Sequence, residues 1–275
     1  MIVARESTPR WQVLGTVLTL MMIMMTSCSE NAESTPAPPL PGDQMAFMVM
    51  SSGGMAPAVY QALAGPALAI YGDGRVLTLA ESPLLTLIPA RYEVAHIDPA
   101  VVASFVAQVE ASGIVNPGTD FGTPRMTDLP STTVLVASRN GEHKVSPYAF
   151  DERFDTRLTE QQRGARAALR SVITQASALA AGATRAPYSP DRVTVYEIEP
   201  RNNNEPATMG WPGPPPSSFL TPSTSRRSIA CGELIADPAE VVYRAALANP
   251  GARWLVDGVT RTLAVNSLPV PGAGA

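Results

Sequence analysis

The stretch PALAIYGDGRVLTLA, residues 66–80, holds two apolar runs that are separated by Gly72-Asp73-Gly74. Glycine tolerates the positive φ that a tight chain reversal requires, and aspartate suits the tip of a turn. The stretch therefore predicts a β-hairpin and, with it, antiparallel pairing. A calcium-binding or phosphate-binding loop is the alternative for this triplet, but the regularly spaced acidic ligands and the following helix of such loops are lacking.

Other parts of the chain carry strand and turn signals of the same kind. The Asn-Gly pair at 140–141 is a strong signal for a two-residue hairpin turn, and we expect Arg139 to face Glu142 across it. A third hairpin is expected to turn at Asp257-Gly258. The strands and hairpins predicted beyond the first one lie at 46–50, 132–148, 193–200 and 253–265.

Three helices are predicted from apolar spacing and from capping residues. The helix over 98–113 begins with Asp98 as N-cap and Pro99 in its first turn, and Gly113 follows its end. Its expected buried stripe is Val102, Phe105, Val106 and Val109. The longest helix is expected over 157–180, with Leu158, Ala165, Leu169, Val172, Ile173 and Leu179 near one face, and the third over 237–251.

These elements predict an α+β fold, in which antiparallel hairpins pack with two or three helices. The segments 98–118 and 237–251 both begin with Asp-Pro and end with Asn-Pro-Gly, and each is followed by a hairpin. An internal duplication of a helix-plus-hairpin unit would explain the match, and common capping chemistry is the alternative. We expect residues 201–227, which include Trp211 and many prolines, to form a surface loop; docking into an aromatic groove of a partner is the alternative.

Composition limits the classes of function that this chain can have. The 275 residues are 45% apolar and 16% charged, with a net charge of −4. That balance is typical of a globular protein with a sizeable core. No basic run or interleaving of basic and aromatic residues is present, so we expect no nucleic-acid partner. All basic residues except Lys144 are arginine, which we interpret as the mark of a GC-rich genome.

The N-terminal residues have the three-part build of an export signal. A short polar segment with Arg5 and Arg10 precedes the uncharged apolar run 13–25, and the small polar residues Thr26 and Ser27 then lead to Cys28. The apolar core of a signal peptide is about 7–15 residues long, whereas a bilayer span needs about 20. We therefore predict a signal peptide over 1–27. A leader cut at another position and an uncleaved anchor are the alternatives.

The residues Met25-Thr26-Ser27-Cys28 resemble the lipobox of bacterial lipoproteins, although Met25 departs from the usual Leu, Val or Ile. The resemblance implies that the Cys28 thiol receives a diacylglyceryl group and becomes the first residue after cleavage. Two acyl chains give stable anchoring, because each buried methylene contributes about 0.8 kcal/mol. We therefore expect the protein at the extracytoplasmic face of the cell membrane, with the membrane as a partner through Cys28.

Residues 28–44 are predicted to be the lipidated cysteine and its tether, and 45–275 the α+β domain, with a subdivision near 185–192 as an alternative. The tether is rich in Ser and Pro, and its 16 residues after Cys28 would reach about 50 Å in an extended polyproline conformation. The hairpin at YGDGRVLT, the Asp-Pro helices and the late Trp-containing hairpin are similar to uncharacterised actinobacterial lipoproteins and secreted proteins. That resemblance implies no particular activity.

Residues that commonly carry catalysis do not form a readable motif. His96 and His143 are 47 positions apart, and neither has another His or Cys at a metal-ligand spacing. No Gly-x-Ser-x-Gly, Ser-x-x-Lys, GxGxxG or P-loop occurs. Glu197 and Glu199 are expected on a solvated strand face. Asp151, Glu152 and Asp155 are expected at the negatively charged start of a helix. Cys231 is expected to be a small buried residue. We predict no catalytic, cofactor or metal site.

The sequence thus favours a lipid-anchored envelope protein whose domain binds a partner, an unknown envelope protein or small apolar ligand, without catalysis. A carrier that encloses a lipid or another small apolar ligand is the alternative from a different class. An enzyme without a readable site is the third. A solute-binding component of an import system is disfavoured, because such proteins alternate strands and helices.

Overall fold

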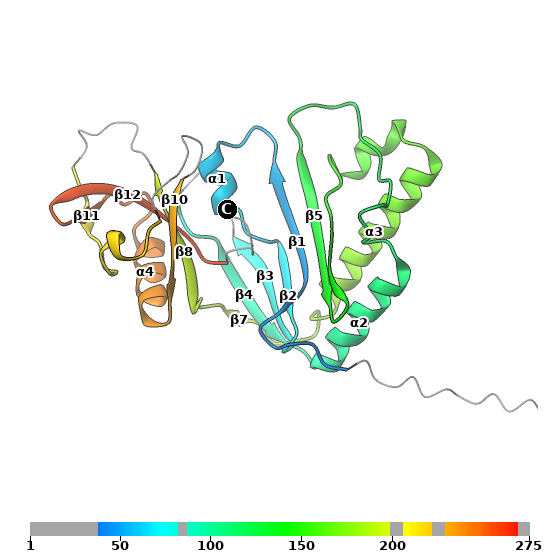
Figure 1. The fold of residues 1–275 in the computed structure, drawn as a ribbon, viewed down its shortest axis with the longest axis horizontal. Coiled ribbons are helices and arrows are strands. Elements are labelled where there is room, and N and C mark those ends of the chain that lie inside the picture. Colours follow the sequence, from blue (N-terminus) through cyan, green and yellow to red (C-terminus); the bar gives the residue numbers. More distant parts are fainter. Residues whose placement is uncertain (1–37, 82–86, 199–205, 222–228, 269–275) are drawn as a thin grey trace, which may run out of the picture. The chain divides into compact units, whose positions relative to one another are not determined.

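The computed structural model describes residues 38–81, 87–198, 206–221 and 229–268. Cys28 and the whole predicted signal peptide lie outside these residues, as does Glu199. The described part of the chain contains two sheets and several helices (Figure 1). No helix within the described ranges is both long and apolar enough to cross a bilayer.

The first sheet has seven strands in the order β6-β5-β1-β2-β3-β4-β7. All its neighbouring strands are antiparallel. Its strands are β1 (Met45–Gly53), β2 (Leu68–Tyr71), β3 (Arg75–Glu81), β4 (Arg91–His96), β5 (Pro130–Ser138), β6 (Gly141–Val145) and β7 (Ala186–Pro187).

The second sheet has five strands in the order β10-β8-β12-β11-β9. Its pairs are antiparallel except for the short parallel pair of β9 with β11. Its strands are β8 (Arg192–Ile198), β9 (Met209–Gly210), β10 (Ala230–Ile235), β11 (Trp254–Val256) and β12 (Val259–Asn266). The α+β class predicted from the sequence is confirmed, but the picture of a few hairpins with helices is wrong, because two broad sheets dominate the chain.

The three predicted hairpins are present, and their turns lie at the predicted residues. Ile70 pairs with Val76, Ser138 with Gly141, and Val256 with Val259. The expected pairing of Arg139 with Glu142 is wrong. Glu142 lies opposite Ala137, because Arg139 and Asn140 are the two loop residues and neither belongs to a strand.

Helix α2 (Pro99–Ser112) begins and ends at clear signals, and helix α3 (Glu160–Ala178) begins at one. The Asp98 side chain accepts a hydrogen bond from the Ala100 amide at 2.8 Å, and Gly113 ends α2 with a φ of +64°. Helix α3 begins three residues later than predicted, because Thr159 and Gln162 form a capping box. The other helical segments are α1 (Ala58–Leu63), η1 (Glu152–Arg157), η2 (Pro216–Ser218) and α4 (Asp237–Ala248).

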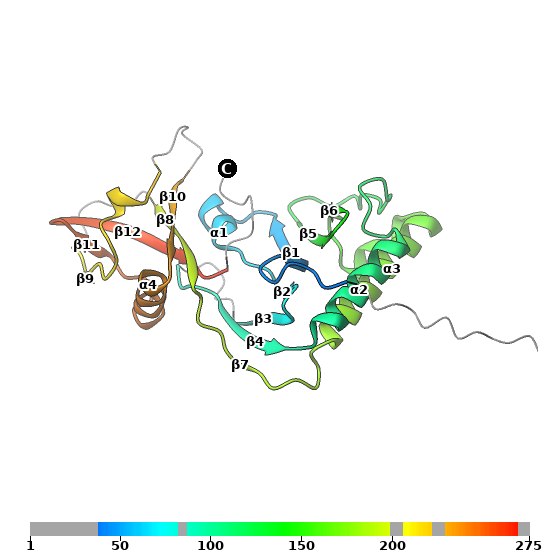
Figure 2. The same ribbon diagram turned by 60° about the horizontal axis from the view of Figure 1, so that its bottom comes forward.

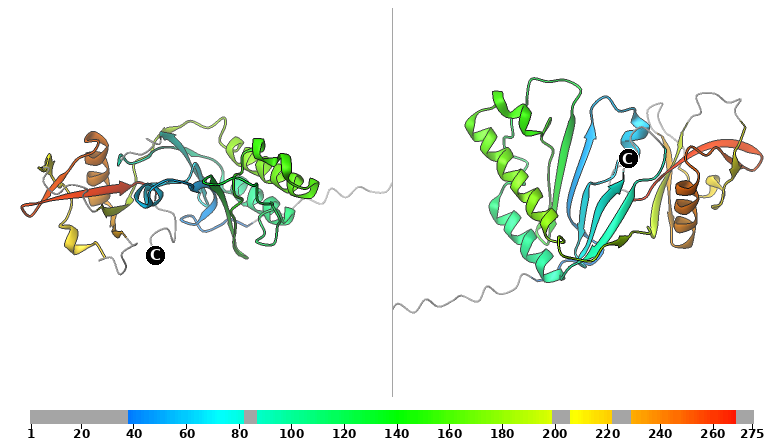
Figure 3. Two further views of the ribbon diagram at one scale, coloured as in Figure 1. Left: turned by 90° about the horizontal axis from the view of Figure 1, so that it is seen from above. Right: turned by 180° about the vertical axis from the view of Figure 1, so that it is seen from behind.

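One face of the first sheet packs against α2 and α3, which lie side by side in Figure 1 and Figure 3. The predicted stripe of α2 is buried there, and the Phe105 ring meets Phe47 of β1 edge-on at 5.2 Å. Strand residues alternate between the two faces, so Met48 and Leu135 belong to a separate cluster on the other face. A further core lies between α4 and the second sheet, which Figure 2 shows next to one another.

The segment that holds Trp211 packs onto this further core as an ordered surface segment. Trp211 meets Trp254 edge-on at 5.3 Å and donates a hydrogen bond to the Pro214 carbonyl at 2.8 Å. Helices α2 and α4 share Asp-Pro but start differently. Asp98 precedes its helix as the N-cap, whereas Asp237 is already helical and Ala236, with a φ of +56°, precedes it.

Candidate functional site

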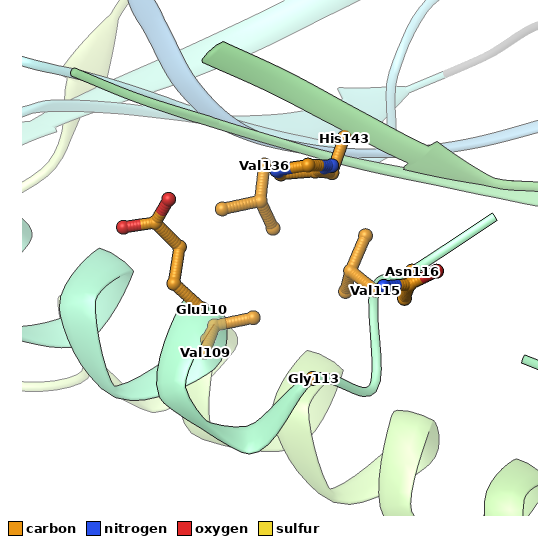
Figure 4. Close-up of a pocket in the computed structure, with 7 residues that line it drawn as sticks. All are labelled: Val109, Glu110, Gly113, Val115, Asn116, Val136 and His143. Atoms are coloured by element: carbon orange, nitrogen blue, oxygen red, sulfur yellow. The ribbon is translucent and has the colours of Figure 1, made fainter. Parts of the chain in front are cut away.

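A small cavity lies where the end of α2 faces the hairpin of β5 and β6 (Figure 4). Helix α2 brings Val109 and Glu110 in its last turn, and the left-handed Gly113 then turns the chain so that Val115 is buried. The hairpin brings Val136 and His143, which are direct cross-strand partners. Because cross-strand partners point to the same face of a sheet, both side chains face α2.

The cavity has a volume of about 100 Å³. Val109, Val115 and Val136 are its buried apolar floor, while Glu110, Asn116 and His143 stand at its rim (Figure 4). A cavity of about 150 Å³ takes benzene, and pockets for larger ligands are about 300–1,000 Å³. The site is therefore matched to a single side chain or a fragment of that size.

The rim is held in place by hydrogen bonds. The Ser138 hydroxyl donates to Oε1 of Glu110 and accepts a hydrogen bond from the Asn140 amide at 2.9 Å. The side-chain oxygen of Asn116 accepts from the Gly118 amide at 2.9 Å. Glu110 is thus fixed to the hairpin turn.

This arrangement differs from that of a hydrolytic triad. In a hydrolytic triad the imidazole stands between the hydroxyl and the acid, so that it takes the proton of the hydroxyl. Here Ser138 donates directly to the acid Glu110. The serine hydroxyl thus donates its hydrogen bond to the carboxylate and not to an imidazole. His143 lies at the rim as a separate polar group. What the site offers is an apolar floor with a fixed negative charge beside it.

The structure separates the two histidines that the sequence offered for a metal site. His96 ends β4, and His143 lies on β6, five strand positions away across the sheet. At about 4.8 Å for each strand spacing, that is roughly 24 Å. A zinc site made from both is excluded by the sheet order. Among the described residues, no group of three or more His, Cys, Asp or Glu side chains could hold a metal ion.

Asp151, Glu152 and Asp155, which were expected at the negatively charged start of a helix, lie at the start of η1, shortly before α3. Asp151 is exposed and caps η1, but Asp155 is buried and lies 2.6 Å from Nε of Arg166 and 2.7 Å from Nη2 of Arg170. The expectation of a helix start did not include this burial, which depends on two arginines of α3. Arg166, whose side chain is 0% exposed, also donates to the carbonyls of Phe121, Tyr148 and Ala149, so its role is to join loops to α3.

Two further residues differ from their expected surroundings. Glu197 of β8 is half-buried and pairs with Arg261 of β12 at 2.6 Å, so it is part of an ion pair rather than of a bare acidic face. Cys231 lies in β10 opposite Tyr196 and is half-buried rather than fully buried, because it stands beside the edge of the second sheet.

Three tyrosines gather on the face of the first sheet that is opposite to α2 and α3. Tyr71 ends β2, Tyr92 lies on β4, and the Tyr188 amide donates to the Tyr92 carbonyl at 2.9 Å. Burial raises the pKa of Tyr188 to about 12 and raises the pKa of Tyr92 still further. Burial also raises the pKa of Tyr71, although the nearby Arg75 guanidinium opposes that shift. The fold therefore keeps these phenols protonated up to a higher pH than an unfolded chain would.

Glu110, Asn116 and Ser138 were not predicted from the sequence as site residues. One signal for Glu110 exists: it follows Val102 and Val106 at four-residue spacing, so an acid continues the buried stripe. It also lies near the C-terminal end of α2, where a negative charge is opposed by the helix dipole. An acid in such a place points to a role other than solvation of the helix.

Comparisons of the chain with models of known protein families, with curated proteins and with solved structures gave no match.

Proposed function

We propose that this protein is a lipid-anchored component of the bacterial cell envelope whose domain binds a partner protein through the cavity between α2 and the β5–β6 hairpin. The sequence around Cys28 supports the anchor. The cavity supports binding, and the observation that carries it is the Glu110 carboxylate fixed by Ser138 beside a floor of three valines. The expected occupant is one side chain with an apolar stem and a cationic tip.

Size and charge together select this occupant. The apolar floor buries a hydrocarbon stem, which contributes about 0.8 kcal/mol for each methylene. Glu110 then attracts a cation at the end of that stem, and such charge-assisted hydrogen bonds are stronger than neutral ones. A carrier function receives less support from this site, because about 100 Å³ is far below the volume of a pocket that encloses a larger ligand.

The binding proposal is tested with a lysine derivative that is blocked at both backbone ends. Amide chemical shifts of Glu110, Val136 and His143 are followed by NMR during titration with millimolar ligand. Saturable shifts at these three positions are expected with blocked lysine, and much smaller shifts with blocked norleucine or blocked glutamate. Equal shifts with all three compounds, or no saturable shift with blocked lysine, would refute the proposed occupant.

Two variants separate charge from shape in the same titration. Glu110→Gln keeps the size of the side chain but removes its charge, and should weaken binding of blocked lysine about tenfold, a difference of about 1.4 kcal/mol. Glu142→Gln is the matched control, because Glu142 is an exposed acid on the same hairpin. A control that weakens binding as much as Glu110→Gln would show a general charge effect rather than a site.

The anchor is tested by fatty-acid labelling of the wild type beside Cys28→Ser. The wild type should incorporate the label and stay with the membrane fraction, and the variant should do neither. Organic extraction of natively purified protein followed by mass spectrometry tests the carrier alternative. A stoichiometric lipid in the extract, beyond the covalently attached chains, would favour that alternative.

A further inference from the structure

Residues 39–44, which the sequence assigns to the tether, pack on the domain. Nη2 of Arg139 donates to the Pro39 carbonyl at 2.5 Å. The amides of Gly72 and Asp73 donate to the carbonyls of Gln44 at 2.9 Å and Gly42 at 3.3 Å. Leu40 packs against the core between the first sheet and its helices. We call residues 39–44 the clasp.

The β2–β3 turn is shaped to receive the clasp. A Cβ atom on Gly72 would stand 2.1 Å from the Pro41 carbonyl oxygen, so a side chain there would push the clasp away. The backbone of Gly72 does not itself require glycine, since its φ is not positive, whereas Gly74 has a φ of +90°. The first glycine of the Gly-Asp-Gly turn is therefore explained by close contact with the clasp.

The clasp and the cavity lie at the same end of the first sheet. Met45 of β1 pairs with Tyr71 of β2 at the β2–β3 turn, and Phe47 pairs with Val136 of β5. Ser138, whose hydroxyl bonds Glu110 at the cavity rim, directly precedes Arg139, which bonds the clasp. The other end of the sheet, where β5 begins at Pro130, is about 26 Å away along eight residue steps.

We infer that the clasp ties the lipid anchor to the end of the sheet that carries the cavity, so that the cavity faces the bilayer. The side chain that binds in the cavity would then belong to a neighbouring membrane protein. This inference rests on the proposed anchor at Cys28. With the clasp bound, ten residues, 29–38, separate Cys28 from it, and a segment of ten residues reaches at most about 31 Å in an extended polyproline conformation. With the clasp released, the reach would be about 50 Å.

Energy transfer between the domain and the membrane tests the orientation. Single cysteines replace Glu142, near the clasp end, or Thr127, near the other end; both positions are exposed. Cys231 is replaced by serine in both proteins, and the Cys28 thiol is blocked by its acyl group. The donor dye therefore attaches only to the new cysteine. The lipidated protein is placed in vesicles of phosphatidylethanolamine and phosphatidylglycerol with an acceptor dye on the headgroups. Transfer from position 142 should exceed transfer from position 127 at least twofold.

Opening the clasp should remove this difference. Leu40→Ser combined with Arg139→Ala takes away the apolar contact and the bond to Pro39, but leaves the strands unchanged. Transfer from positions 142 and 127 should then become similar. Hydrogen exchange at the Gly72 and Asp73 amides should accelerate at least tenfold in this variant, which shows that the clasp has opened in a folded domain.

The outcomes separate the inference from the proposed function. Fatty-acid labelling and membrane retention are measured on the same preparation. A wild type without label overturns the proposed anchor and the orientation with it. A labelled wild type with equal transfer from both positions, or with unprotected Gly72 and Asp73 amides, overturns the inference alone.

Discussion

Replacing Asp155 by asparagine is expected to lower the free energy of unfolding by about 3–5 kcal/mol, because it leaves a buried arginine without its counter-charge. Asp155 lies 2.6 Å from Nε of Arg166 and 2.7 Å from Nη2 of Arg170. The side chain of Arg166 is 0% exposed and that of Asp155 only 7%. Asparagine keeps the shape and one acceptor oxygen but not the charge.

The surroundings of Arg166 set this magnitude. After the substitution, the guanidinium keeps the carbonyls of Phe121, Tyr148 and Ala149 as acceptors and the Phe150 ring at 5.2 Å. These groups are dipoles or an apolar ring, and none carries a full charge. Burial lowers the pKa of Arg166, and Asp155 opposes that shift. A loss of 3–5 kcal/mol is a large part of a typical total stability of about 5–15 kcal/mol.

The assay is urea unfolding followed by far-UV circular dichroism. Trp211 and Trp254 both pack in the second sheet, so tryptophan fluorescence would follow that core instead of the one that holds Asp155. Asp151→Asn is the control, because the Asp151 side chain is 53% exposed and its contact with Arg153 is 3.4 Å. An exposed pair is worth about 0–1 kcal/mol, and asparagine remains a good N-cap.

Two results would refute this reasoning. One is a loss below about 1 kcal/mol in Asp155→Asn, no larger than in the control. The other concerns the double variant Asp155→Asn with Arg166→Met, in which the uncompensated charge is gone. Its loss should be smaller than the sum of the two single losses, so strict additivity would show that charge burial is not the cause.

Three further predictions concern the turns, the helix starts and the buried phenols. Gly72→Ala should lower the free energy of unfolding in urea by about 1–3 kcal/mol, since the new methyl group would collide with the clasp. Gly182→Ala is the control and should be neutral or stabilising, because a Cβ atom there meets no atom within 4 Å. Equal losses in the two variants would contradict the close contact. Asp98→Ala should lower the stability by about 1 kcal/mol, because Asp98 is the N-cap of α2. Asp237→Ala should lower it by only a few tenths of a kcal/mol, because Asp237 lies inside the first turn of α4 and does not cap it. A larger loss in Asp237→Ala than in Asp98→Ala, measured by thermal unfolding, would contradict these two helix starts. Burial raises the pKa of Tyr188 from 10.0 to about 12, so between these pH values the folded chain keeps a proton that the unfolded chain loses. The contribution of this phenol to the free energy of unfolding is therefore complete below about pH 10 and falls as pH rises toward 12. Tyr188→Phe should flatten this fall when urea midpoints are measured against pH, and an unchanged slope would count against the prediction.

Local structure could be predicted from the sequence where its cause is local. The Gly-Asp-Gly, Asn-Gly and Asp-Gly turns, the cap at Asp98 and the stripe of α2 are all as predicted. Each depends on residues within one or two helical turns or on two strands joined by a short loop. The backbone preferences and apolar spacing that decide such features are written in a few neighbouring residues.

Some strands were missed because their own residues give little signal. Strand β10 contains Ala230, Cys231 and Gly232, which do not favour an extended chain on their own. A Cβ on Gly232 would stand 2.2 Å from the Phe219 carbonyl oxygen, so the position is set by a neighbouring segment. Strands β7 and β9 have two residues each and exist only because a longer strand offers them an edge.

The sequence by itself determined the three hairpin turns, the capped start of α2 and the α+β class. The exported lipoprotein anchored at Cys28 stays a prediction. Only the tertiary structure decided that Glu110 bonds Ser138 and lines one cavity with His143, that Asp155 is buried against Arg166, and that the clasp packs on Gly72. The residues brought together in this way are 11 to 33 positions apart in the chain. Sheet order and register bring such residues together, and neither is encoded in the spacing of a short segment.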